Sequence, residues 1–209
     1  MPLSDAFIRN AIAKIYDCAI EPELWRETLE YLRVELDTAF CSLQFVHFPE
    51  NYPADAPHTE LYHTDWDVQW FAALQPHIAK IPNFERMLNS DIDTPMTQMQ
   101  VIDEESFKQS EFYDVWVSPQ NLRDTLNANV IRRDNMTAIL SSPSYTSRAL
   151  FDDRDRALVA ELTPHVRRAL LISDLLDEKK AQVEVYQRML DGLTCAVFMV
   201  EKSARLMYC

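Results

Sequence analysis

Glycine occurs once in this 209-residue chain, at Gly192, whereas proteins use about 7% glycine on average. With a single glycine, the chain cannot form the glycine-rich loops that hold phosphates or the dinucleotide-binding fingerprint of the Rossmann fold. It also lacks the G-x-S-x-G elbow on which α/β-hydrolases mount their nucleophile. The sequence therefore disfavours nucleotide-dependent enzymes and such hydrolases, and we expect a protein that is not an enzyme.

The net charge is −13, and most of it lies in residues 1–150, which hold 23 acidic and 11 basic residues. An acidic surface repels phosphate backbones, so this chain is not expected to bind nucleic acid by itself. The N-terminus has no basic region followed by an apolar core, and no apolar run approaches the ~18 residues that span a membrane. We expect neither a signal peptide nor a membrane segment.

Four cysteines are scattered along the chain without C-x-x-C spacing: Cys18, Cys41, Cys195 and Cys209. This usage suits a reducing compartment better than a disulfide framework. Together with the missing signal peptide, it predicts a cytoplasmic protein.

The clearest local pattern is a hairpin, in which apolar and polar residues alternate over 125–130 and 136–140 around a turn at 133–135. Other expected elements are helices beginning at Ser4 or Asp5 and at Pro22, strands over 39–48 and 60–63, a helix over 66–74 capped by Thr64 or Asp65, a helical turn at 84–88, and a helix over 111–117 capped by Ser110. Antiparallel strands flanked by helices indicate an α+β domain.

A long helix is predicted from Asp152 onward, with Pro164 expected to end or kink its first portion. Up to about residue 172, its apolar face is typical of a helix that packs on a core. Beyond residue 174 the sequence is too charged for deep burial, and its heptad pattern favours a helical dimer seam. The candidate seam residues are Ile172, Leu176, Val183, Tyr186 and Leu190.

Two short β-like runs, 195–200 and 205–209, follow the long helix and are separated by a polar turn. This pattern predicts a hairpin, and an isolated hairpin is marginally stable at best in water. We therefore expect residues 192–209 to be the first hairpin of a further module, in a protein that continues beyond residue 209.

Three stretches of the chain resemble a known family. The phrase IYDCAIEPELW at 15–25 resembles the end of the first helix in a group of LuxR-type helix-turn-helix transcription regulators, and LTPHVRRAL at 162–170 resembles a second phrase of theirs. Residues 190–209 look like the start of the PAS-like module that follows in those proteins.

The resemblance implies a GAF/PAS-like sensory domain over residues 1–172, a helical connector over 173–191 and a truncated PAS-like domain over 192–209. It also implies a homodimer that reaches DNA only through a helix-turn-helix domain beyond this chain. The function expected is ligand sensing for transcription regulation. The alternative is a ligand-free dimerisation scaffold of a signalling protein, and an intact aromatic-walled cavity would separate the two.

A group of aromatic residues on two predicted helices is the best pocket candidate, because aromatic walls bury apolar ligands well. The partner expected there is a small apolar metabolite, with core packing as the alternative role of these rings. The candidate residues are Trp66, Trp70, Phe71, Phe112, Tyr113 and Trp116.

Two polar groups are weaker candidates. His58, His63, Asp65 and Asp67 lie close in sequence, but their spacing matches no zinc signature, so we expect a solvated polar loop and no metal or other cofactor. His165 has no nucleophile or carboxylate partner in sight, and we expect it to serve helix packing.

Overall fold

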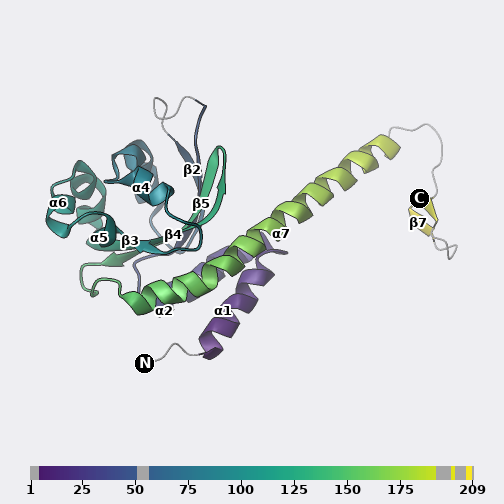
Figure 1. The fold of residues 1–209 in the computed structure, drawn as a ribbon. Helices are drawn as coiled ribbons and strands as arrows, with labels where there is room; N and C mark the ends of the chain where they lie inside the picture. Colours follow the sequence, from purple (N-terminus) through teal and green to yellow (C-terminus); the bar gives the residue numbers. More distant parts are fainter. Residues whose placement is uncertain (1–4, 51–56, 192–198, 201–205, 209) are drawn as a thin grey trace.

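The computed structural model describes residues 5–50, 57–191, 199–200 and 206–208. Its centre is an antiparallel sheet with strand order β2-β1-β5-β4-β3 (Figure 1). The strands are β1 (Ser42–His47), β2 (His58–His63), β3 (Met96–Thr97), β4 (Leu122–Arg133) and β5 (Met136–Tyr145). The predicted α+β fold is confirmed.

The two faces of the sheet carry different kinds of helix. One face packs against α1 (Asp5–Asp17), α2 (Trp25–Leu36) and the first half of α7 (Asp153–Asp191). Short segments cover the other face: α3 (Val68–Leu74), α4 (Phe84–Leu88), α5 (Gln98–Val101), α6 (Glu104–Lys108) and a π-helical turn, Tyr113–Val117. Short 3₁₀ helices lie at Pro22–Leu24, between α1 and α2, and at Gln75–Lys80 and Ser118–Gln120.

The helical side of the sheet holds the larger core. In α2, Trp25, Leu29, Leu32 and Leu36 repeat at spacings of three and four and are all buried. They meet the even-numbered residues of β4, from Leu126 to Val130, in one apolar cluster. Because side chains alternate along a strand, the odd-numbered residues of β4 face the short helices instead.

The long helix α7 runs without a break through Pro164, so the prediction that this residue could end the helix is wrong. Proline removes one backbone hydrogen bond and crowds the preceding turn, at a cost of about 3 kcal/mol. Here Leu162 and Val166 flank it and are both buried in the core. Burial on either side offsets the cost, because each apolar side chain contributes about 1.5–3 kcal/mol.

Left-handed backbone positions are filled by aspartate and asparagine in this glycine-poor chain. Asp37, Asn83, Asp93 and Asn121 have φ between 49° and 60°. Their short polar side chains tolerate this region better than other non-glycine residues do. Asp37 ends α2 in this way, and its N–H donates to the carbonyl oxygens of the last turn.

The start of α3 differs from the prediction. Its cap is Asp67, whose carboxylate accepts the N–H of Gln69 at 3.0 Å, and not Thr64 or Asp65. Thr64 Oγ1 instead accepts the N–H of Cys41, and Asp65 pairs with Arg26. Trp66 therefore lies in the loop before α3, where its ring can point under the helix layer.

At the C-terminus, β6 (Met199–Val200) and β7 (Leu206–Tyr208) pair antiparallel. The other residues of the predicted hairpin, 192–198, 201–205 and 209, lie outside the described residues, and the assignment of a PAS-like module stays a prediction. Among the helices that the structure describes, none combines the length and apolar character that crossing a membrane requires.

Asp124 of β4 gives a pH-dependent prediction. It is 2% exposed, and its Oδ1 accepts the N–H groups of Thr125 and Met99 at 2.8 and 3.3 Å. Burial raises the pKa of this carboxyl above its ordinary value, against the opposing effect of these hydrogen bonds. The folded state therefore binds the proton more tightly than the unfolded state. The resulting stability is present below the ordinary aspartate pKa and is lost as pH rises through the raised one.

We expect Asp124→Asn, which keeps the Oδ1 acceptor, to gain stability relative to the wild type between pH 4 and pH 7. Urea unfolding at both pH values measures the difference. A difference that does not change with pH would contradict the assignment of a buried carboxylate at this position.

Candidate functional site

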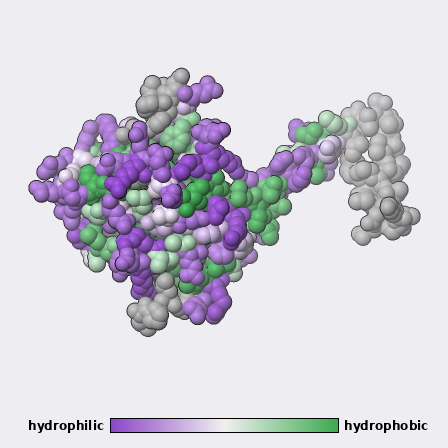
Figure 2. Space-filling view, viewed as in Figure 1, coloured by the Kyte–Doolittle hydropathy of each residue, from purple (hydrophilic) through white to green (hydrophobic). Residues whose placement is uncertain are grey.

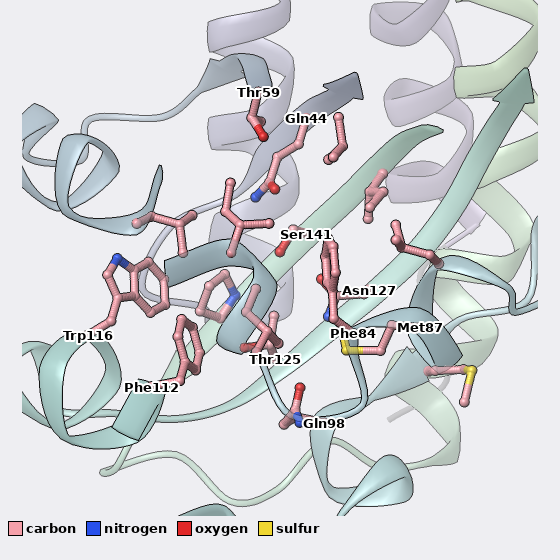
Figure 3. Close-up of a pocket in the computed structure, with 18 of the residues that line it drawn as sticks. Gln44, Thr59, Phe84, Met87, Gln98, Phe112, Trp116, Thr125, Asn127 and Ser141 are labelled. Atoms are coloured by element: carbon pink, nitrogen blue, oxygen red, sulfur yellow. The ribbon is translucent and has the colours of Figure 1, made fainter. Parts of the chain in front are cut away.

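A cavity of about 80 Å³ lies between the sheet and the layer of short helices. Figure 3 shows side chains from the strands on one side of it and aromatic rings on the other. The same alternation that puts Leu126 and Ala128 in the core turns Thr125, Asn127 and Asn129 toward this space. The cavity is thus built into the fold by the β4–β5 hairpin.

The sheet forms a polar floor. Asn127 of β4 lies directly opposite Ser141 of β5, and Gln44 of β1 lines the same cavity. Gln44 donates to Ser42 Oγ at 3.0 Å. Within the described part of the chain, the side chains of Thr125, Asn127 and Ser141 have no hydrogen-bond partner. The floor therefore presents an amide and two hydroxyl groups that are free to bind a molecule in the cavity.

The opposite wall is aromatic. Phe40 stacks on Trp66 with 4.0 Å between ring centroids, and Phe112 stacks on Trp116 at 5.3 Å. Trp66 and Trp116 meet edge to face at 5.8 Å. Indole N–H groups on this wall are satisfied, since Trp116 Nε1 donates to Trp70 O at 2.9 Å and Trp66 Nε1 to Gln120 Oε1 at 2.9 Å. The rings are therefore held in fixed positions and offer their faces and edges to an apolar group.

Of the six aromatic residues predicted from the sequence, Trp66, Phe112 and Trp116 line the cavity. Trp70 lines a separate hollow that shares Phe40 and Trp66 with the cavity, and its carbonyl oxygen accepts the indole N–H of Trp116. Tyr113 packs edge to face on Phe107, and Phe71 is half-buried on α3 without lining the cavity. The structure brings three of the six together at the cavity; their binding of a ligand stays a proposal.

Sequence reasoning missed the polar floor and several apolar residues. The floor was visible as the polar half of the alternation in β4 and β5, which reads equally well as a solvent-facing surface. The sequence predicts a helix over 66–74 and a helical turn at 84–88, but no local signal showed that apolar residues of these and neighbouring short segments cover a cavity. These residues are Leu74, Ile78, Ile81, Phe84, Met87, Leu88, Met96 and Phe107.

The segment after α4 covers the cavity and is tied to the sheet. Asn129 Nδ2 lies 2.9 Å from Met87 O and 2.9 Å from Ser90 Oγ, and Arg132 donates to Ser90 O at 2.6 Å. Asp93, further along this segment, accepts a hydrogen bond from Arg167 of α7 at 2.6 Å. One ion pair thus links the cover of the cavity to the long helix.

This ion pair is made through one oxygen and one nitrogen only. Asp93 Oδ1 and Arg167 Nε are buried, and neither has a hydrogen-bond partner among the described residues. A carboxylate and a guanidinium can also form two parallel hydrogen bonds. The contact between cover and helix can therefore tighten by a small rotation of either side chain.

Two cysteines and one histidine of the described residues lie in surroundings that alter their acidity. Burial raises the pKa of the Cys41 thiol to about 12, and burial also raises the pKa of Cys18. A thiol is a weak nucleophile when its thiolate is this disfavoured. His165 Nδ1 lies 3.2 Å from Tyr16 Oη, and burial and then Arg168 lower the pKa of its ring. His165 joins α7 to α1, in line with the packing role expected for it.

The two histidines and two aspartates considered as metal ligands each make other contacts. His63 Nδ1 lies 2.6 Å from Thr64 O, Asp67 caps α3, Asp65 pairs with Arg26, and His58 Nε2 lies 3.6 Å from Glu60. Nowhere in the described ranges do three histidine, cysteine or acidic side chains converge as metal ligands do.

The second half of α7 extends away from the sheet and its helices (Figure 1). Four of the candidate seam residues, Ile172, Leu176, Val183 and Tyr186, are exposed on it; the last two are 52% and 63% exposed. Leu190 belongs to α7, but its side chain lies outside the described residues. Figure 2 shows apolar surface where α7 leaves the sheet and again further along. The helix thus carries an apolar stripe that nothing within the described chain covers.

Comparison with solved structures identifies this architecture. The ligand-binding domain of VqsR from Pseudomonas aeruginosa matches with a TM-score of 0.58 at 16% identity, over 79% of this chain and 94% of that one. The N-acylhomoserine lactone-dependent LuxR-family transcription factor CepR2 from Burkholderia cenocepacia matches with a TM-score of 0.54 at 12% identity, over 79% and 98%. The chain has the fold of LuxR-type ligand-binding domains.

A GAF domain is also similar. The phycoerythrobilin-bound GAF domain of a cyanobacterial phytochrome matches with a TM-score of 0.50 at 12% identity, over 84% of this chain and 98% of that one. The GAF-like fold expected from the sequence resemblance is thereby confirmed. No protein-family model matches the sequence, and no curated protein sequence matches it.

Proposed function

We propose that residues 1–172 are the ligand-sensing domain of a cytoplasmic transcription regulator. The observation that carries this proposal is the cavity between the sheet and its short helices, with a polar floor and an aromatic wall. Binding sites for small molecules are mostly apolar cavities with a few well-placed polar groups. The fold, shared with ligand-binding domains of LuxR-type regulators, supports the same function.

The cavity also favours sensing over the ligand-free scaffold. A scaffold needs only a filled core, and protein interiors pack to a density of about 0.74–0.76 with few voids larger than a water molecule. A cavity of about 80 Å³ with unpaired polar groups on its floor has no role in such a protein. Binding, with no catalytic step, is the activity that we propose for this site.

We further propose that residues 173–191 form a connector that pairs with a second copy of the chain, with residues 192–209 opening a second sensory module. DNA would be reached only through a helix-turn-helix domain outside this chain. The ion pair Asp93–Arg167 supports the proposal that ligand binding is transmitted to α7, because it joins the segment that covers the cavity to this helix. A ligand that moves the cover changes this contact, and it can shift α7 only by its difference in affinity between the two states.

A thermal-shift screen with uncharged metabolites tests the proposal. A ligand present at about 100 times its Kd stabilises the folded state by about 2.7 kcal/mol, which raises the Tm of a chain of this size by several degrees. The expected result is a shift for the wild type and for Ser147→Phe, which adds a ring at an exposed position. We expect no shift for Ser141→Phe, which places the same ring in the cavity.

Two outcomes would count against the sensory proposal. One is a broad screen in which no compound raises the Tm of the wild type. The other is an equal shift for Ser141→Phe and the wild type, which would place the binding site elsewhere.

A further inference from the structure

We infer that the cavity takes a compact, uncharged ring compound that carries a hydrogen-bond donor and acceptor side by side, as a carboxamide or lactam does. This inference rests on the proposed sensory function and narrows its ligand to one chemical class.

The lining excludes ionic ligands. Within the described residues, every side chain that lines the cavity is apolar, hydroxyl-bearing or a carboxamide, and none carries a charge. Moving a carboxylate or an ammonium group from water into such a site without a partner of opposite charge is strongly unfavourable. An acid or an amine would thus have to bind in its neutral form, at a cost in affinity.

The floor of the cavity favours a ligand that carries a hydrogen-bond donor beside an acceptor. Asn127 carries both an N–H₂ donor and a carbonyl acceptor on one planar group, and neither is used by a described residue. A ligand amide can meet this group with two parallel hydrogen bonds. Ser141, directly opposite on β5, and Thr125 add hydroxyls that can donate or accept. A ligand with only an acceptor would pair with the amide N–H₂ of Asn127 and leave its carbonyl oxygen without a donor.

A second unpaired group lies at another side of the cavity. Thr59 of β2 lines it, is 3% exposed, and its buried Oγ1 has no hydrogen-bond partner among the described residues. Buried polar groups almost always have partners, and leaving one unpaired destabilises the folded state. The polar groups of the floor are thus arranged for a molecule that this chain does not itself supply.

Size and wall composition favour a ring. The cavity volume of about 80 Å³ is smaller than the roughly 150 Å³ of an engineered cavity that binds benzene, so one small ring with a short substituent fits only if the short helices over it move outward, and a long alkyl chain fits less well. Trp66, Phe112 and Trp116 line the cavity, and aromatic rings of this kind pack well against flat groups. One molecule can therefore lie between the aromatic wall and the floor with its amide on Asn127.

Three probes of the same shape test whether the cavity prefers a neutral amide to an anion or a cation. Benzamide, benzoate and benzamidinium are titrated into the full chain by calorimetry. We expect benzamide to bind at least about tenfold more tightly than either ion, because each 1.4 kcal/mol is a factor of ten and burying an unpaired charge costs more than that.

Variants of Asn127 test whether this residue binds the amide group of the ligand. Asn127→Leu is expected to weaken benzamide binding about tenfold. Asn127→Asp is expected to reverse the preference, so that benzamidinium binds more tightly than benzamide. Because a misfolded protein would lose binding, a gain in affinity for benzamidinium cannot come from misfolding. Asn135→Asp makes the same change at the exposed tip of the hairpin and should keep the wild-type preference. Ser141→Ala provides a second, milder change on the floor.

The outcomes separate this inference from the sensory function. Equal binding of benzoate and benzamide, or an unchanged preference in Asn127→Asp, overturns the ligand class. Binding of N-decanoyl homoserine lactone or of a charged screening compound, with no binding of benzamide, also overturns it but leaves the sensory function standing. If no compound of any kind binds, both proposals fail.

Discussion

Val183→Glu is expected to convert the dimer that we propose into a monomer. Val183 lies on the apolar stripe of the second half of α7, together with Ile172, Leu176 and Tyr186, and is 52% exposed in the single chain. In a parallel pair of helices, seam residues of the two copies face each other. The substitution therefore brings two carboxylates together in a desolvated seam, and we expect the dissociation constant to rise at least about 100-fold, or about 2.7 kcal/mol.

Sedimentation velocity over a range of concentrations measures this effect. Ala181→Glu is the matched control, because it adds the same charge two residues away, on the opposite side of the heptad pattern. The control should remain a dimer. A wild type that is monomeric at every concentration, or a Val183→Glu variant that dimerises as the wild type does, would refute the seam.

The elements with strong periodicity could be predicted from the sequence. The stripe of Trp25, Leu29, Leu32 and Leu36 predicts α2, and these residues are buried as expected. The hairpin predicted over 125–140 is present as β4 and β5, and the turn expected at 133–135 falls where the two strands meet. Such patterns are read reliably because one face of each element must be apolar to join a core.

The candidate site could be predicted only in part. The aromatic residues Trp66, Phe112 and Trp116 stood out because large rings are rare and are usually buried. Asn127 and Ser141 did not, because polar residues alternating with apolar ones are typical of a strand with one face in water. Only the tertiary position of the short helices turns that face into the floor of a cavity.

The segments that cover the floor lie beyond the reach of local patterns. β3 and α5, for example, are two and four residues long and were not predicted. They are held by long-range contacts, such as Asp124 Oδ1 accepting the N–H of Met99. The pair Asp93–Arg167 joins residues 74 positions apart. A single sequence contains no local signal for contacts of this kind.

Trp116→Ala is expected to cause the largest loss of stability among these variants, about 3–5 kcal/mol. Trp116 is 6% exposed, stacks on Phe112, contacts Trp66 and Phe40 edge to face, and donates its indole N–H to Trp70 O. The substitution removes all of these contacts, leaves the Trp70 carbonyl without this partner, and enlarges the cavity. Trp70→Ala, at a half-buried ring that does not line the cavity, is the control and should cost less than half as much.

Indole should restore part of the stability lost in Trp116→Ala. It has the shape of the missing side chain, including the N–H group that Trp70 O accepts, and a dry apolar void binds a compound of matching shape. Binding to the folded state alone raises the free energy of unfolding with ligand concentration. Urea unfolding with and without millimolar indole should therefore show a larger gain for Trp116→Ala than for the wild type, and Trp70→Ala should gain no more than the wild type. Equal gains in all three proteins would mean that indole binds elsewhere, and that the wall around Trp116 collapses when its ring is removed.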